Sequence, residues 1–233
     1  MSGADEEDDD DVHKQFKLIL LGDGAVGKTS IAKRFSDDQF NRLYKQTVGV
    51  DFFIRRMKVP PNFNLALQLW DIGGQSIGSK MITNYITGAH AVLLCYDITN
   101  YDSFVNLEDW HRLVLRAFDK KELPYIALVG NKYDLRHASV VQQEQHNQFA
   151  QENQLNSFLM SAKSGDQVKQ AFFNVACTLV GVQPSKHDIE IQSEILPAMI
   201  IDHQRHDEAV NEGKVPDYIK PNKIRLDRLC IVM

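Results

Sequence analysis

The sequence has only three cysteines among its 233 residues, and no C-x-x-C pair or histidine cluster accompanies them. This scarcity argues against a zinc site or a disulfide framework and favours a reducing, cytosolic compartment. No apolar run approaches the ~18 residues of a membrane-spanning helix, and no secretory signal precedes the first predicted strand. The formal net charge is −5, so the dense basic surface typical of nucleic-acid-binding proteins is also missing.

Composition divides the chain into three parts. Residues 1–14 are polar and contain an acidic run from Asp5 to Asp11. Such a block buries nothing and is predicted to be disordered, with an acidic docking arm as the weaker alternative. Residues 15–182 are predicted to form one globular domain, because 43% of the sequence is hydrophobic. Residues 183–233 are predicted to be a mostly extended tail.

Strand-like and helix-like segments alternate between residues 16 and 182. Near-continuous apolar strands, such as residues 91–95, suit a parallel sheet that is covered on both faces. A turn sequence at residues 60–64 lies between two strand-like segments and predicts a hairpin with one antiparallel edge strand. The fold class is therefore α/β, a doubly wound, six-stranded and mostly parallel sheet, with the ligand beyond the carboxyl ends of the strands. The predicted strands are 17–21, 51–58, 65–71, 91–97, 125–131 and 157–160, and the predicted helices are 28–35, 81–87, 103–118, 141–153 and 168–180.

The strongest functional signal is Gly22-Asp23-Gly24-Ala25-Val26-Gly27-Lys28-Thr29, which fits G-x-x-x-x-G-K-[ST]. It lies between a predicted strand and a predicted helix, and this context favours a phosphate-binding loop over a glycine-rich turn. Backbone N–H groups of the loop, continued by Ser30, can surround phosphate oxygens. Lys28 can reach the β- and γ-phosphates, and the Thr29 hydroxyl can ligate Mg²⁺. The motif alone indicates only a nucleoside triphosphate.

Besides the Thr29 hydroxyl, a carboxylate that holds Mg²⁺ through water is expected at Asp71, where a predicted strand ends. Gly74 can then present its N–H to the γ-phosphate, and Gln75 can orient a water molecule for in-line attack. The alternative is a plain turn at Gly73 and Gly74, which the strand-end aspartate and the following amide disfavour.

Two further segments at strand ends favour guanine as the base. In Asn131-Lys132-Tyr133-Asp134, the Asp134 carboxylate can accept hydrogen bonds from the guanine ring N–H and the exocyclic amine. Adenine would leave that carboxylate unpaired, which argues against a P-loop ATPase or nucleotide kinase. Lys132 can lie along the base plane. In Ser161-Ala162-Lys163, the Ala162 N–H can face the guanine carbonyl.

Together these motifs resemble the Rab branch of the Ras superfamily of small GTPases. The resemblance covers roughly residues 16–182 and implies a P-loop small G-protein fold that binds GTP or GDP with Mg²⁺. Three segments are similar to the divergent twenty-eighth Rab subfamily: Asp-Ile-Gly-Gly-Gln at residues 71–75, Lys-Gln-Thr at 45–47 and Asp-Phe-Phe at 51–53. The segments that carry the resemblance are 22–29, 47–52, 70–75, 96–100, 131–134 and 161–163.

The resemblance also assigns residues that the motifs alone leave open. It implies that Thr47, in switch I, binds Mg²⁺ and senses the γ-phosphate, that Phe40 stacks on guanine, and that Tyr44 covers the phosphates. A core aromatic is the alternative for Phe40. The Rab effector-facing aromatics correspond to Phe52, Trp70 and Tyr85, with ordinary core or strand packing as the competing interpretation.

The family further implies a monomeric switch that hydrolyses GTP slowly. Its expected partners are a guanine-nucleotide exchange factor, a GTPase-activating protein and effectors selective for the GTP form. Switch II departs from the family, because Ile72-Gly73-Gly74-Gln75-Ser76 stands where most Rabs carry Thr-Ala-Gly-Gln-Glu. We expect a mobile switch II and an unusual set of partners. A GTP-binding module with little or no hydrolysis is the alternative.

The final residues, Cys230-Ile231-Val232-Met233, fit the C-a-a-X pattern and predict one prenyl group on Cys230, with a chance cysteine as the alternative. One lipid gives marginal, reversible membrane binding. We therefore expect cycling between the cytoplasm and the cytoplasmic face of a membrane, endosomal or ciliary, with the help of a prenyltransferase and a prenyl-binding solubilising factor.

Overall fold

The protein is described by a computed structural model that covers residues 14–75, 81–118 and 123–192. The acidic N-terminal run, the part of switch II from Ser76 to Lys80 and the C-terminal Cys230 lie outside the described residues. Within the described ranges, no helix is both long enough and apolar enough to cross a membrane.

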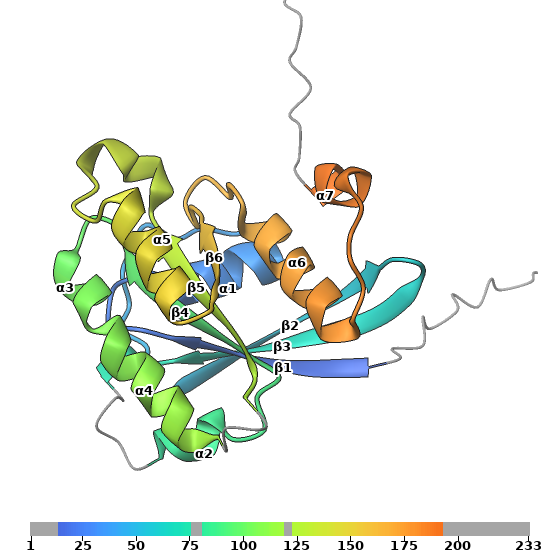
Figure 1. The fold of residues 1–233 in the computed structure, drawn as a ribbon, viewed down its shortest axis with the longest axis horizontal. Coiled ribbons are helices and arrows are strands. Elements are labelled where there is room, and N and C mark those ends of the chain that lie inside the picture. Colours follow the sequence, from blue (N-terminus) through green and yellow to red (C-terminus); the bar gives the residue numbers. More distant parts are fainter. Residues whose placement is uncertain (1–13, 76–80, 119–122, 193–233) are drawn as a thin grey trace, which may run out of the picture. The chain divides into compact units, whose positions relative to one another are not determined.

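One six-stranded sheet forms the centre of the domain, in the order β2-β3-β1-β4-β5-β6 (Figure 1). β2 pairs with β3 in antiparallel fashion, while the other neighbouring strands are parallel. The predicted α/β sheet with one antiparallel edge strand is confirmed. The strands are β1 (Lys14–Leu21), β2 (Val50–Val59), β3 (Phe63–Ile72), β4 (Ala91–Asp97), β5 (Tyr125–Asn131) and β6 (Asn156–Leu159).

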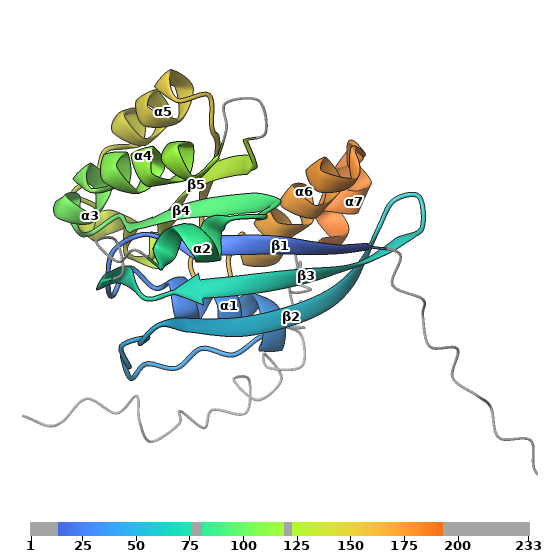
Figure 2. The ribbon, with the colours of Figure 1, turned by 90° about the horizontal axis from the view of Figure 1, so that it is seen from below.

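Helices cover both faces of the sheet, and Figure 2 shows α1 on one side and α4 and α5 on the other. The alternation of β1 explains this arrangement. Leu18 and Leu20 pack into a core with α1 and α6, while Ile19 and Leu21 pack into a second core with α2 and α4. All four side chains are fully buried, which is why the strand reads as a continuous apolar run. The helices are α1 (Lys28–Asp37), α2 (Ile82–Ile86), α3 (Tyr101–Val105), α4 (Leu107–Ala117), α5 (Gln143–Glu152), α6 (Val168–Val180) and α7 (Lys186–Gln192).

The helix predicted over residues 103–118 is instead two helices, α3 and α4, which meet at Asn106. α3 begins two residues early because the Asn100 side chain caps it by accepting the Ser103 N–H at 3.3 Å. At the junction, the Asn106 amide reaches across to the Asp23 carboxylate at 2.7 Å. This contact joins residues that are distant in sequence, so helical periodicity does not predict it.

The structure also differs from the expected extended tail at residues 186–192, which form α7. Its first turn is held by a reciprocal cap. The Ser185 hydroxyl donates to Asp188 Oδ2 at 2.6 Å, and the Asp188 N–H donates to Ser185 Oγ at 3.2 Å. This Ser-x-x-Asp spacing is a variant of a helix-start pattern and is visible in the sequence.

Candidate functional site: a nucleotide cavity at the carboxyl edge of the sheet

The predicted phosphate loop connects the central strand β1 to α1. Gly27, with φ at +99°, lies so close to the Asn131 side-chain amide that any side chain there would collide with it. The same Asn131 amide donates to the carbonyl of Val26 at 2.9 Å. The loop is therefore held against the end of β5, where the predicted base motif begins.

Lys28 is buried at the start of α1 and bends back over the loop. Its ammonium donates to the carbonyls of Gly22 and Asp23, each at 2.7 Å. Burial lowers the pKa of Lys28, and the neighbouring Asp71 carboxylate partly opposes this shift. The lysine charge is thus kept inside the loop, next to the place where anionic phosphate groups would lie.

Three oxygen-bearing side chains converge beside Lys28. The hydroxyls of Thr29 and Thr47 lie 2.8 Å apart, and both donate to Asp71 Oδ2, the Thr47 hydroxyl at 3.3 Å. The other oxygen of Asp71, Oδ1, is buried without a hydrogen-bond partner. Burial raises the pKa of Asp71, and the hydrogen bond from Thr29 counteracts it.

This donor set fits Mg²⁺. Hydroxyl and carboxylate oxygens are the ligands that the ion prefers, and an orphaned buried carboxylate oxygen calls for a partner. The residues that would hold the ion are Thr29, Thr47 and, through water, Asp71. The described residues contain no group of three or more His, Cys, Asp or Glu side chains that could hold a metal, so this site would bind through hydroxyls and a single carboxylate.

The predicted base motif surrounds Asp134. Its Oδ1 accepts the Ser161 hydroxyl at 2.7 Å, and its Oδ2 pairs with the Lys163 ammonium at 3.3 Å. Burial opposes ionisation of Asp134, but these two partners outweigh it and lower the pKa of the carboxyl below its usual value. Asp134 is therefore an ionised acceptor at neutral pH.

Two residues of the predicted base motifs, Ala162 and Lys132, have contacts that were not part of the prediction. The Ala162 N–H, predicted to face guanine, donates to Asn131 Oδ1 at 3.1 Å. The Lys132 ammonium pairs with Asp97 Oδ2 at 2.6 Å, and Asp97 also accepts from the Thr99 hydroxyl at 2.7 Å. Asp97 therefore fixes the lysine that is expected along the base plane.

These motifs line one cavity of about 320 Å³. The predicted residues that line it are Gly24, Ala25, Gly27, Lys28, Thr29, Ser30, Phe40, Tyr44, Thr47, Gly74, Gln75, Asn131, Lys132, Asp134, Ala162 and Lys163. Sequence reasoning missed Lys33, Asn41, Arg42, Leu43, Lys45, Gln46 and Leu135, which also line it. Most of these belong to the irregular segment between Phe40 and Thr47. The one sequence feature that could have indicated them is their position between these two predicted site residues.

Other predicted residues do not line the cavity. Val26 is buried in the core beside α1, and the buried Ser161 acts on Asp134. The Asp23 side chain accepts hydrogen bonds from Asn106 and Trp110. Gly22 lies beneath the loop, where its backbone approaches that of Cys95 on β4.

The two switch segments touch through backbone atoms. The Gly73 N–H donates to the carbonyl of Gly49 at 2.9 Å. A Cβ atom at Gly73 would lie 2.5 Å from the Thr47 carbonyl oxygen, which is closer than real Cβ contacts. The departure at Gly73 thus permits a close approach, in addition to the backbone freedom that glycine brings.

The proposed effector-facing aromatics lie outside the cavity. Phe52 and Trp70 are paired across β2 and β3, with ring centroids 4.6 Å apart in an edge-to-face arrangement. Phe52 is 58% exposed, and the Lys17 ammonium lies 3.8 Å from the centroid of the Trp70 ring. Tyr85, on α2, is partly buried against the same core as Trp70.

The combination of phosphate loop, oxygen cluster and guanine-type base motif on this sheet defines a small guanine-nucleotide-binding protein. Residues 17–180 match the Ras family. The chain is 41% identical to Ras-related protein Rab-28 of Caenorhabditis elegans, over 88% of this chain and 83% of that protein. It is 35% identical to Rab-10 of the same species (78% and 89%) and 38% identical to Rab-13 of Rattus norvegicus (69% and 78%).

The chain belongs to the Ras family and is a Rab-type small GTPase. The predicted resemblance to Rabs is confirmed, including the likeness to the twenty-eighth subfamily.

Proposed function

We propose that this protein is a Rab-type switch that binds GTP and GDP with Mg²⁺, hydrolyses GTP slowly and recruits effectors in membrane trafficking. The observation that supports this most strongly is the single cavity, which is lined by the phosphate loop, by Thr47 and Gly74, and by Asp134. One nucleotide can therefore contact the base motif and both switch segments at once.

Guanine selectivity is assigned to Asp134. Its ionised carboxylate accepts the two donors on the Watson–Crick edge of guanine, and adenine cannot supply that pair. A buried polar group left without its partner rejects an analogue by ~10⁴ or more. Lys132, held by Asp97, supports the plane of the base.

Hydrolysis is assigned to Gln75, which lines the cavity next to Gly74. Its amide orients the attacking water, while Lys28 stabilises negative charge on the β- and γ-phosphates. When Mg²⁺ is bound, it neutralises further charge on the same oxygens. We expect an intrinsic rate on the order of 10⁻⁴ to 10⁻³ s⁻¹, which a GTPase-activating protein raises by supplying a further positive charge next to the γ-phosphate.

The switch itself lies in Thr47 and Gly74. In the GTP form the Thr47 hydroxyl takes part in holding Mg²⁺, and the Gly74 N–H binds the γ-phosphate. Loss of that phosphate releases both contacts. Effectors selective for the GTP form would read this ordered arrangement, with Phe52, Trp70 and Tyr85 as the proposed contact surface. An exchange factor would return the protein to GTP.

A competition and single-turnover experiment tests this function. The purified protein should bind a fluorescent GDP analogue that GTP and GDP displace and that ATP and ADP do not. Preloaded with γ-labelled GTP, it should release phosphate slowly, and Gln75→Leu should bind GTP equally well and lose most of the hydrolysis. Displacement by ATP would contradict the base assignment.

One specific observation favours the alternative, a GTP-binding module with little hydrolysis. Gly73 brings the switch I backbone against switch II in a way that the usual alanine would not permit. A backbone contact of this kind next to Gln75 could hold the glutamine away from the position that orients water. Equal hydrolysis by the wild type and Gln75→Leu, with an activating protein present, would support the module.

Membrane association is proposed to depend on a prenyl group at Cys230. This would need a prenyltransferase and a prenyl-binding solubilising factor, and the protein would cycle between the cytoplasm and an endosomal or ciliary membrane. Cys230→Ser should move the protein to the supernatant on cell fractionation while its GDP affinity stays unchanged. Unaltered membrane association of that variant would remove the lipid from this proposal.

A further inference from the structure

Arg34 lies near the end of α1, outside every predicted motif, and its side chain is only 16% exposed. The guanidinium donates through Nε to the carbonyl of Ala162 at 2.9 Å and through Nη2 to the carbonyl of Lys163 at 2.8 Å. Both acceptors belong to the loop that follows β6 and lines the base side of the cavity. One side chain of the helix after the phosphate loop therefore holds two consecutive peptide groups of the base loop.

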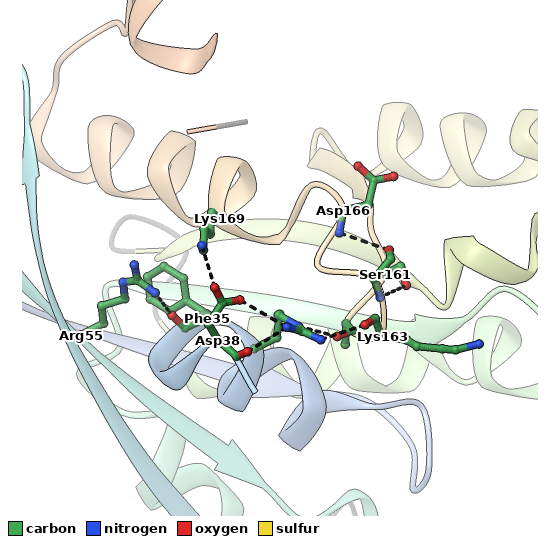
Figure 3. Close-up of polar contacts among 10 residues, drawn as sticks. Phe35, Asp38, Arg55, Ser161, Lys163, Asp166 and Lys169 are labelled. Carbon is green, nitrogen blue, oxygen red and sulfur yellow. Dashed lines mark hydrogen bonds and ion pairs between the residues drawn. The ribbon is translucent and has the colours of Figure 1, made fainter. Parts of the chain in front are cut away.

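The third arm of the guanidinium is used at the end of α1 itself. Nη1 donates to the carbonyl of Asp38 at 2.8 Å and to its carboxylate at 3.3 Å. Figure 3 shows Lys169 next to Asp38, and the Lys169 ammonium donates to the same carboxylate at 2.9 Å. The hydrogen bond from Lys169, together with that from Arg34, lowers the pKa of Asp38. The geometry therefore fixes the plane of the guanidinium on more than one side.

The two loop carbonyls matter because of the geometry of the peptide group. The bond between Ala162 and Lys163 is trans, so its carbonyl and its N–H point in opposite directions. When Arg34 holds the Ala162 carbonyl toward α1, the Lys163 N–H is directed away from α1. Ala162 and Lys163 both line the cavity, so this N–H is the donor that we assign to the 6-position of a bound purine base.

The 6-position distinguishes guanine from adenine. Guanine has a carbonyl there, which accepts hydrogen bonds from N–H donors, while adenine has an amine, which would oppose them. A loop that is held firmly preserves the selectivity against adenine, because it cannot turn its donors away from the adenine amine. Leaving a buried polar group without a partner is costly, so the rigidity of the loop contributes to selectivity.

We propose that Arg34 is a positioning residue for guanine recognition: it fixes the loop 161–163 against α1 so that the Lys163 N–H faces the base carbonyl, while the Ala162 N–H is held by Asn131. This inference rests on the proposed function, because it assumes that the cavity holds a guanine nucleotide. It assigns part of the base selectivity to a residue that touches neither base nor phosphate.

The test compares Arg34→Gln and Arg34→Lys with the wild type and with a control, Arg112→Gln. Arg112 is an exposed arginine on α4 that pairs only with acidic residues of its own helix in the described structure. Three quantities are measured: the dissociation rate of a fluorescent GDP analogue from protein loaded with it, the ratio of GDP to ADP affinity, and the single-turnover rate of GTP hydrolysis by protein loaded with GTP.

Arg34→Gln should release GDP about tenfold faster, because hydrogen bonds from a charged group are lost. Its preference for GDP over ADP should fall by a similar factor, while hydrolysis of bound GTP stays within about twofold of the wild type. Arg34→Lys should fall between the two, since an ammonium can reach one carbonyl but cannot form the planar fork. The control should match the wild type in all three quantities.

Three results would overturn the inference. In the first, Arg34→Gln and Arg34→Lys release GDP at the rate of the control. In the second, release accelerates and the GDP-to-ADP ratio is unchanged, which would indicate general loosening of α1. In the third, the rate of GTP hydrolysis falls by the same factor by which GDP release accelerates, which would place the defect in the phosphate loop. If Arg34→Gln does not fold, Arg34→Lys gives the same comparison. A wild type that fails to prefer GDP would instead refute the proposed function.

Discussion

The Asp23 carboxylate accepts the indole N–H of Trp110 at 2.8 Å, and Trp110 is fully buried. The other carboxylate oxygen accepts the Asn106 amide at 2.7 Å. A buried indole N–H needs a partner, and here the phosphate loop supplies it. The second residue of the loop therefore fixes the loop to the junction of α3 and α4, and its side chain does not line the nucleotide cavity.

Removing this carboxylate should destabilise the protein. Asp23→Ala leaves the buried Trp110 N–H unpaired, so the free energy of unfolding should fall by about 1–3 kcal/mol. Asp23→Asn keeps an acceptor oxygen for Trp110 and should lose less. Urea denaturation of the GDP-bound proteins measures both, and equal stability of Asp23→Ala and the wild type would contradict this role.

Asp134→Asn should change the preferred base. The amide cannot accept both guanine donors, and xanthine carries a carbonyl where guanine has its amine. The variant should therefore bind XDP more tightly than GDP, by at least tenfold. Competition against a fluorescent nucleotide gives both affinities. A variant that binds GDP and XDP as the wild type does would show that Asp134 does not contact the base.

Gly73→Ala tests the contact between the two switch segments. The added methyl group would meet the Thr47 carbonyl, so switch I must shift and the Thr47 hydroxyl must leave the Mg²⁺ site. GTP affinity should fall at least about fivefold relative to GDP affinity, because overpacking costs about 1–3 kcal/mol. Gly181→Ala is the control for general destabilisation: a Cβ there meets nothing within 4 Å, but the backbone φ of +83° strains an alanine at a position that does not line the cavity. Calorimetric titration with each nucleotide would contradict the prediction if the ratio of GTP to GDP affinity of Gly73→Ala equals that of the control and the wild type.

Stability should depend on pH through His146. This histidine is buried on α5 and lies 3.0 Å from the Tyr96 hydroxyl, and burial lowers its pKa to about 4. The unfolded chain binds the proton below pH ~6.5 while the native state does not. Its contribution to stability is therefore present above pH ~6.5 and is lost as the pH falls toward 4, by up to about 3 kcal/mol.

His146→Gln removes this titration and should flatten the pH dependence. Urea denaturation of the GDP-bound wild type and variant at pH 7, 6 and 5 measures the difference. If the two slopes are parallel over this range, His146 does not supply the pH dependence.

Sequence patterns predicted those elements whose ends coincide with a change from apolar to polar residues. The bounds of β4, β5 and α6 were predicted to the residue. The break at Asn106 was not predicted, and the hydrogen bond that ties this junction to Asp23 spans 83 residues of sequence. Local periodicity carries no signal for such a contact.

The same limit applies to the site. Residues that we propose to touch the nucleotide through side chains of fixed chemistry, such as Lys28 and Thr29, have a motif spacing that can be recognised. Arg34 contacts two backbone carbonyls, and Asp97 contacts the side chain of Lys132. No motif spacing marks such contacts, because an arginine on a helix or an aspartate at a strand end is common in any sequence. Their roles became visible only when the loops were placed in space.

Asn131 has a consequence for how the cavity empties. Its side chain donates to Val26 in the phosphate loop and accepts from Ala162 in the base loop. The phosphate loop and the base loop are therefore both hydrogen-bonded to the same side-chain amide. A movement that pulls either loop away strains the bond to the other, so departure of the nucleotide should loosen both loops in one concerted event.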